Sequence, residues 1–323
     1  VSWSFIKAFI KEHITPRGDE AKDWTTTDVC EKIVKPLTLA HNCSFIDLFK
    51  NQMDEQGKPL VAPATVFISH AWKYKFTEPL DVIEQHEKQH PGSYYWFDLF
   101  NNEQNNAAVR PYEWWSTTFR ESIKQIGKVV VVMSPWNNPI PVTRAWCLFE
   151  IISALDQEGV NFEAMLPQAQ REAFLFGLIE KPESIFQALA DIQAEKAEAF
   201  KQSDKEMIFR TIEESKGFQH VNERVNAQMR EWYIQTTQSI ADSSNSDPAE
   251  DEGKLFNQAG FVLQEFGELD KSLEYYSKSL NIKLKTFGES HPSTATSYNN
   301  IAEVYRSKGE YRSHDEYRSH GEY

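Results

Sequence analysis

The sequence contains little cysteine. Only Cys30, Cys43 and Cys147 occur in 323 residues, and their spacing matches neither a zinc-finger pattern nor a disulfide framework. Small secreted domains that depend on disulfides are much richer in cysteine than this chain is. The scarcity therefore argues against a cysteine-based metal site, and it predicts a reducing, cytoplasmic setting.

Positive charge is also scarce. The chain has 34 lysines and arginines against 48 aspartates and glutamates, which gives a formal net charge of −14. Nucleic acids and anionic membranes attract basic surfaces, so this balance argues against both as general partners. Every apolar run is much shorter than the ~20 residues of a membrane-spanning helix. No signal-peptide pattern opens the chain, and since it begins at Val1 we expect residues to precede it.

What the chain does contain is typical of folded globular domains. The hydrophobic fraction is 40%, the aromatic fraction is 13%, and the length suffices for two or more domains. In the first segment we expect a helix to begin at Asp28, with Glu31 completing a capping box. The order of apolar, polar and charged stretches predicts a helical extension (residues 1–60), an α/β domain (61–168), a helical bridge (169–240), an acidic linker (241–254) and a repeat segment (255–323).

The second of these segments alternates between strand and helix patterns. Such alternation predicts a parallel α/β sheet, in which ligands bind beyond the carboxyl ends of the strands. The strands are expected at residues 65–70, 94–100, 129–133 and 160–166. The helices are expected at residues 80–90, 112–126 and 144–155.

The central part of this domain is organised around one strand and the helix after it. Val129 to Met133 is an unbroken apolar run, typical of a strand buried on both faces. Three prolines between residues 135 and 141 then require a loop, and we expect Thr143 to cap the following helix. Glu150 is the only carboxylate among the apolar residues of that helix. Because burying an unpaired carboxylate is costly, Glu150 is expected to be either half exposed or functional.

Two stretches of this domain resemble a TIR-like domain. Residues 66–72, Val-Phe-Ile-Ser-His-Ala-Trp, are similar to the family's first box, in which a strand leads into a polar turn. Residues 146–151, Trp-Cys-Leu-Phe-Glu-Ile, resemble the Trp-Cys-x-x-Glu-Leu motif on the helix after the central strand. The resemblance implies a flavodoxin-like parallel sheet. Where TIR domains are enzymes, they cleave NAD between ribose and nicotinamide, and the catalytic glutamate of the motif corresponds to Glu150.

The implied chemistry is physically reasonable for a carboxylate. Nicotinamide leaves a cationic ring as a neutral molecule, so no general acid is required. The ribose becomes oxocarbenium-like, and a nearby carboxylate stabilises that positive charge. In this reaction NAD is a substrate, and we expect no separate cofactor and no metal. The residues expected to bind the substrate are Ser69, His70, Trp72, Lys73, Asp98, Trp136, Trp146 and Cys147.

Each of these assignments has a simpler alternative. We expect Trp72 or Trp136 to stack on the rings of NAD, but both side chains would serve equally well in loop or core packing. Lys73 or Lys75 is expected at the pyrophosphate, or else the two form an ordinary solvated pair. Glu150 could instead pair with Arg144 or with a neighbouring chain. Because many TIR domains are adaptors without activity, the second hypothesis is a protein-binding adaptor.

An internal repeat follows the acidic linker. Gly260 corresponds to Ala302 and Gly267 to Gly309, and both pairs are 42 residues apart. The segment resembles the tetratricopeptide repeats of kinesin light chains, including the Phe-Gly-x-x-His-Pro connection at residues 287–292. The resemblance implies a module that binds proteins or associates with itself. About three repeats usually make a stable stack and this chain has roughly one and a half, so we expect either a fragment of a longer array or packing on the preceding helices.

Two further patterns carry weaker expectations. Residues 311–323 form a low-complexity tail with a six-residue period. His86 and His90 lie four residues apart on a predicted helix and could share a metal ion. With no third ligand nearby in the sequence, we expect a solvated face there rather than a metal site.

Together these patterns predict a signalling or scaffold protein that couples a TIR-like domain to a tetratricopeptide module. In one hypothesis the domain hydrolyses NAD with Glu150, and in the alternative both modules only bind proteins. The expected partners are proteins, bound through the TIR-like and repeat surfaces. We also expect self-association, because active sites of TIR-like domains are often completed by a neighbouring subunit.

Overall fold

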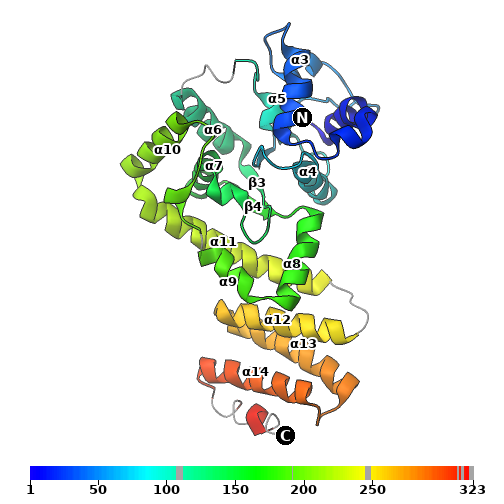
Figure 1. Cartoon of the computed structure of the whole chain (residues 1–323), viewed down its shortest axis with the longest axis vertical. Helices are drawn as coiled ribbons and strands as arrows, with labels where there is room; N and C mark the ends of the chain where they lie inside the picture. Colours follow the sequence, from blue (N-terminus) through cyan, green and yellow to red (C-terminus); the bar gives the residue numbers. More distant parts are fainter. Residues whose placement is uncertain (107–111, 191, 244–248, 311–312, 314–315, 320–323) are drawn as a thin grey trace. The chain divides into compact units, whose positions relative to one another are not determined.

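The protein is seen here in a computed structural model, whose chain divides into two compact units (Figure 1). Unit 1 comprises Val1–Gln170 and Ile192–Val225, and unit 2 comprises Arg171–Asp191 and Asn226–Tyr323. The structure describes residues 1–106, 112–190, 192–243, 249–310, 313 and 316–319. Part of the expected linker and most of the low-complexity tail lie outside these residues. Among the helices described, none combines the length and the apolar character needed to cross a bilayer.

Four parallel strands form the sheet of unit 1, which confirms the predicted parallel α/β architecture. They lie in the order β2-β1-β3-β4. The strands are β1 (Val66–Ser69), β2 (Tyr95–Trp96), β3 (Lys128–Val132) and β4 (Asn161–Met165). The expectation for β2 was too long, because the chain turns after Phe97 into the short helix α5 (Asp98–Asn101). There the Asn101 side chain accepts the backbone N–H of Phe97 at 3.0 Å, so this amide is not available to a strand neighbour.

Helices cover both faces of this sheet (Figure 1). On one face lies α4 (Thr77–Gln89), whose Val82 and Ile83 share a core with Val130 and Val132 of β3. On the other face lie α6 (Tyr112–Ile126) and α7 (Ala145–Leu155), both in contact with β1 and β3. Alternate residues of a strand point to opposite faces. A sheet covered on both faces therefore needs apolar residues at every position of its central strands, which is the pattern of the valine run in β3.

Short helices form the extension at the start of unit 1. They are α1 (Trp3–Phe9), η1 (Ile10–Ile14), η2 (Thr15–Ala21), α2 (Thr26–Val29), η3 (Cys30–Val34), α3 (Lys35–Thr38) and η4 (Phe45–Phe49). Phe5, Phe9, Phe45 and Phe100 pack together with ring centroids 4.8–6.0 Å apart. The expected capping box is present but begins three residues earlier. Thr25 caps α2, and Asp28 returns the hydrogen bond to the backbone of Thr25, so the prediction of a start at Asp28 was wrong.

The loop before α7 is supported by a distant segment of unit 1. It forms the short helix η6 (Ile140–Thr143), in which the Thr143 hydroxyl donates to the carbonyl of Ile140 at 2.9 Å. The first backbone N–H of α7, on Ala145, donates instead to the carbonyl of Glu198 at 2.9 Å. Thr143 therefore does not cap α7 with its side chain, as we had expected. The remaining elements of unit 1 are η7 (Ala194–Lys196), α10 (Gln202–Ser215) and the first part of α11 (Gly217–Ser243).

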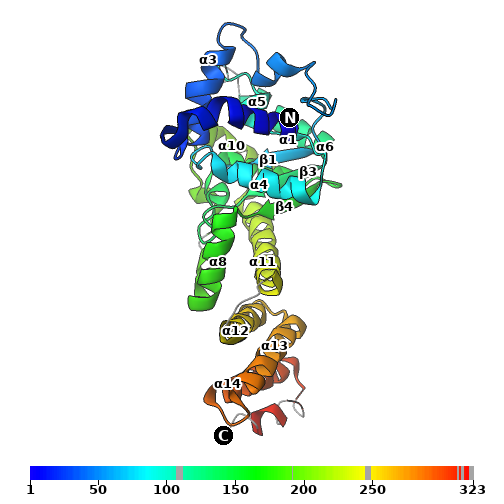
Figure 2. The same ribbon diagram turned by 90° about the vertical axis from the view of Figure 1, so that its right-hand side faces the viewer.

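Unit 2 is helical throughout its described residues. It contains most of α8 (Gln168–Glu180), then α9 (Glu183–Ala190), the second part of α11, α12 (Ala249–Glu265), α13 (Leu269–Phe287) and α14 (Pro292–Lys308). Figure 2 shows α12 beside α13 and α13 beside α14. Tyr276, Leu280, Ile301 and Val304 form the apolar core between α13 and α14. The described part of the expected linker is helical, since residues 241–243 end α11 and residues 249–254 begin α12.

Candidate functional site

The carboxyl ends of β1 and β2 and the first half of α7 bring several of the predicted site residues together. Ser69 ends β1, His70 follows it, and Asp98 follows β2 at the start of α5. The Ser69 hydroxyl donates to Oε2 of Glu150 at 2.5 Å. One turn earlier on α7, the thiol of Cys147 donates to the carbonyl of His70 at 3.6 Å. The edge that parallel α/β sheets use for ligands therefore carries a cluster of buried polar groups.

Trp72 and Asp98 extend this cluster. The indole N–H of Trp72 donates to Oδ2 of Asp98 at 2.5 Å, and Nδ1 of His70 lies 3.9 Å from Oδ1 of the same carboxyl. The other nitrogen of His70, Nε2, lies 3.1 Å from the hydroxyl of Thr26 in the extension. None of the predicted site residues belongs to the extension, and Thr26 is fully buried there. No signal in the sequence marks this threonine, because its partner lies 44 residues further along the chain.

Burial determines the protonation of this cluster. Only 8% of Glu150 is exposed, and burial raises its pKa to about 8, with the hydrogen bond from Ser69 opposing the shift and the charge of Asp98 adding to it. Burial likewise raises the pKa of Asp98 to about 7, against the hydrogen bond from Trp72. It lowers the pKa of His70 to about 3 and raises that of the Cys147 thiol. At neutral pH Glu150, His70 and Cys147 are therefore uncharged.

Three further predicted residues, Lys73, Trp136 and Trp146, make no hydrogen bond to Glu150 among the contacts seen in the described residues. Lys73 is exposed. Trp136 is buried, and its backbone N–H donates to the side chain of Gln170 at 3.0 Å. The indole N–H of Trp146 donates to Asp204 of α10 at 3.1 Å, and its ring packs edge-on against aromatic rings of α6 and α7. For the two tryptophans these contacts fit the packing alternative, and their role in binding a substrate stays a prediction.

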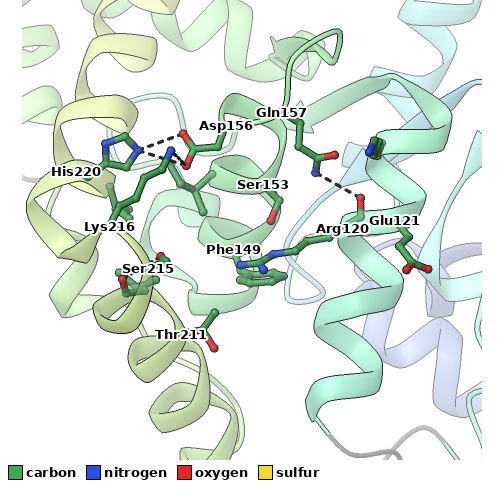
Figure 3. A pocket seen from close by; sticks show the side chains of 14 residues that line it. Arg120, Glu121, Phe149, Ser153, Asp156, Gln157, Thr211, Ser215, Lys216 and His220 are labelled. Carbon is green, nitrogen blue, oxygen red and sulfur yellow. Dashed lines mark hydrogen bonds and ion pairs between the residues drawn. The ribbon is translucent and has the colours of Figure 1, made fainter.

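A pocket of about 460 Å³ lies on another side of α7, where α6, α10 and the start of α11 meet it (Figure 3). The guanidinium of Arg120 lies over the Phe149 ring, 4.9 Å from its centroid. Asp156 accepts from Lys216 at 2.9 Å and lies 3.2 Å from Nε2 of His220. None of the predicted site residues lines this pocket. Its lining comes from helices far apart in the sequence and follows no local motif, which explains why the sequence did not indicate it.

In unit 2, the helices α12 and α13 cross at very short range. A Cβ atom at Gly260 would lie 2.8 Å from the ring of Tyr276, so only glycine fits there without a shift. Hydroxyls of α13 also bond to the α12 backbone, from Ser272 to the carbonyl of Gly260 at 2.8 Å and from Ser279 to the carbonyl of Gly253 at 2.7 Å. Gly267, with φ of +76°, makes the turn between the two helices. Glycine at these two positions therefore allows the close crossing of α12 with α13 and the turn that joins them.

Comparisons with known proteins agree with this geometry for the repeat segment. Residues 251–313 match the family model of the tetratricopeptide repeat. Searches of curated proteins and of solved structures gave no significant match to the chain. Tetratricopeptide stacks bind other proteins through their surfaces. Residues 251–313 are therefore a tetratricopeptide-repeat segment, a module for protein interaction.

Proposed function

We propose that unit 1 is a TIR-like domain that cleaves NAD between nicotinamide and ribose, and that the tetratricopeptide segment binds proteins, copies of this chain among them. The observation that carries the proposal is the hydrogen bond between Ser69 and Glu150. These residues belong to the two stretches that resemble the family and are 81 positions apart, yet their side chains meet at the ligand-binding edge of the sheet. The strand order β2-β1-β3-β4 is also the order with which flavodoxin-like folds begin.

In the proposed reaction Glu150 acts as a carboxylate beside the ribose. The bond from C1′ to the nicotinamide nitrogen breaks, and its electron pair leaves with the neutral nicotinamide. The carboxylate stabilises the resulting sugar cation until water adds to C1′ and releases a proton. A cationic nicotinamide ring nearby would lower the pKa of Glu150 and so favour the ionised form that the step requires. Because only 8% of Glu150 is exposed, the reaction also requires the cluster to open.

The burial of Glu150 favours a second function, that of an adaptor without activity. In this reading the protonated carboxyl joins α7 to β1 through Ser69 and is a structural group. Both modules of the chain would then act only by binding proteins. The resemblance of the repeat segment to kinesin light chains supports protein binding in either case. It rests on the connection before α14, where the rings of Phe287 and His291 stack at 4.5 Å and His291 caps the helix.

Nicotinamide release from NAD by the full chain at high protein concentration separates the two functions. At low NAD concentration, where the rate reports the protein free of NAD, we expect release that rises with pH toward 9, because Glu150 ionises with a pKa of about 8. Glu150→Gln keeps the shape of the side chain and should reduce the rate ~100-fold or more. The matched control is Glu158→Gln, which removes an exposed carboxylate just beyond α7 and should leave the rate unchanged.

Each outcome has one meaning. Loss in Glu150→Gln together with full activity in Glu158→Gln supports the proposed hydrolase. No release by the parent protein at any pH or concentration leaves the adaptor. Release that persists in Glu150→Gln would mean that the reaction is real but depends on another residue.

A further inference from the structure

A second group of polar side chains lies on the α4 face of the sheet. His86 and His90 come from the end of α4, and Glu163 comes from the edge strand β4. One ligand atom from each residue lies within 4.8 Å of the others. The sequence showed the pair of histidines but not the carboxylate, because Glu163 reaches them only through the pairing of β4 with β3. The third ligand, whose absence argued against a metal site, is therefore present.

The hydrogen bonds of His86 leave one of its nitrogens available to a metal ion. Nδ1 of His86 lies 3.1 Å from the hydroxyl of Tyr95, and that hydroxyl donates to Oε2 of Glu87 at 2.9 Å. Because the hydroxyl has one proton and gives it to Glu87, it accepts from His86, so Nδ1 carries the ring proton. The lone pair is then on Nε2. A hydrogen bond of this kind at the distal nitrogen is what usually orients a metal-binding histidine.

Nε2 of His86 is buried and has no hydrogen-bond partner among the described residues, although only 1% of the residue is exposed. A buried polar atom without a partner is uncommon and costs free energy. A bound metal ion would satisfy this atom.

The remaining ligands are held less tightly. The ring of His90 is 4.7 Å from that of His86, and His90 is an exposed residue at the end of α4. Glu163 pairs with Lys128 through Oε2 at 2.9 Å, while 31% of its side chain remains exposed. This ion pair orients the carboxylate and leaves Oε1 for another partner. The ammonium of Lys128 opposes a cation nearby, and the carboxylate of Glu163, which pairs with it, offsets this charge.

We propose that Nε2 of His86, one ring nitrogen of His90 and Oε1 of Glu163 bind a divalent transition-metal ion of the zinc class. Two imidazoles and one carboxylate suit zinc better than magnesium or calcium, which prefer oxygen ligands throughout. Zinc bonds of 2.0–2.2 Å place tetrahedral ligands about 3.3 Å apart. The ligand atoms therefore have to approach one another slightly, and the exposed ring of His90 is free to make this movement. The fourth position remains open to water, and the bound ion joins α4 to β4.

This site is independent of the proposed function. Glu163 lies opposite Val130 in the sheet, on the face packed against α4, whereas Glu150 comes from α7 on the other face. Failure of either proposal therefore leaves the other intact.

Zinc titration of the full chain tests the proposal. The protein is prepared without a histidine tag and freed of metal with a chelator. Every sample carries Cys43→Ser, because Cys43 is the least buried cysteine and its thiol could bind zinc. Calorimetry should show one equivalent of Zn²⁺ bound, and Co²⁺ should give the visible absorption of a tetrahedral site. His90→Ala and Glu163→Gln should each weaken Zn²⁺ binding tenfold or more. The control His41→Ala, at an exposed histidine of the extension, should leave the affinity unchanged.

Thermal unfolding provides a second measurement, since a ligand bound only by the folded state raises the Tm. At the same zinc concentration, the Tm of the parent and of His41→Ala should rise by more than that of the other two variants. Circular dichroism without metal checks that all the variants are folded. The proposal is overturned if the parent binds no zinc, or if either His90→Ala or Glu163→Gln binds it as tightly as the parent.

Discussion

Two buried groups of unit 1, the Glu150 carboxyl and the His86 imidazole, differ in how they are satisfied. Around Glu150 the carboxyl accepts a hydrogen bond from Ser69, and burial favours the uncharged acid. Around His86, Nε2 is also buried but lacks a partner among the described residues. A buried group that is bonded within the protein is first of all evidence for stability, whereas a buried group without a partner points to a ligand. The comparison thus indicates a structural contribution from Glu150, whether or not it is catalytic, and supports the proposed binding role of His86.

The largest expected effect is on stability, and it contrasts the carboxylates of the two clusters. Glu150→Ala removes a buried side chain and leaves the Ser69 hydroxyl without its acceptor, so we expect a loss of about 3 kcal/mol in the free energy of unfolding. Glu163→Ala breaks a partly exposed ion pair with Lys128 and should cost less than about 1 kcal/mol. Urea denaturation at pH 6, without metal, measures both. Equal losses would abolish the distinction between the clusters.

A second effect, smaller per pH unit than this loss, is on the pH dependence of stability and follows from the raised pKa of Glu150. Its pKa is about 8 in the folded protein, against an ordinary value of 4.5, so the folded state holds the proton more tightly than the unfolded state does. The resulting stabilisation is complete below pH 4.5 and is lost as the pH rises toward 8. Relative to the parent, Glu150→Gln should therefore gain about 1.4 kcal/mol per pH unit between pH 5 and 8. A difference that does not change with pH would show that Glu150 is ionised when buried.

Most of the fold could be predicted from the sequence, because strands buried on both faces appear as continuous apolar runs. The elements that differ depend on contacts that no local pattern records. The start of α7 is supported by the carbonyl of Glu198, so a threonine in the expected capping position was misleading. The start of α2 was predicted three residues late. Asp28 fits two positions of a capping box, the N-cap itself and the third helical residue, and in the structure it is the third residue of a box that begins at Thr25. Propensity alone does not separate these two roles.

The candidate sites show the same limit. The meeting of Ser69 with Glu150 followed from the rule that the ends of parallel strands share one edge. Thr26 and Glu163 were missed, because each joins its cluster through tertiary packing rather than through spacing. Glu163 lies inside a short strand, where a glutamate on an edge strand resembles an ordinary solvent-facing residue. Its neighbours become visible only when the pairing of β4 with β3 is known.

The smallest expected effect concerns the hydroxyl that orients His86. Tyr95→Phe removes the acceptor of the Nδ1–H bond while keeping the buried ring, so His86 loses the contact that directs its lone pair at Nε2. We expect Zn²⁺ affinity to fall about tenfold, as is usual when the hydrogen-bond partner of a metal ligand is removed. The matched control is Tyr94→Phe, where the hydroxyl donates to the carbonyl of Pro59 instead. Since neither change touches the cluster around Glu150, both variants should release nicotinamide as the parent does. Equal zinc affinity in Tyr95→Phe and the parent would mean that His86 binds zinc without the hydrogen bond from Nδ1. The claim that Tyr95 orients His86 as a metal ligand would then be wrong.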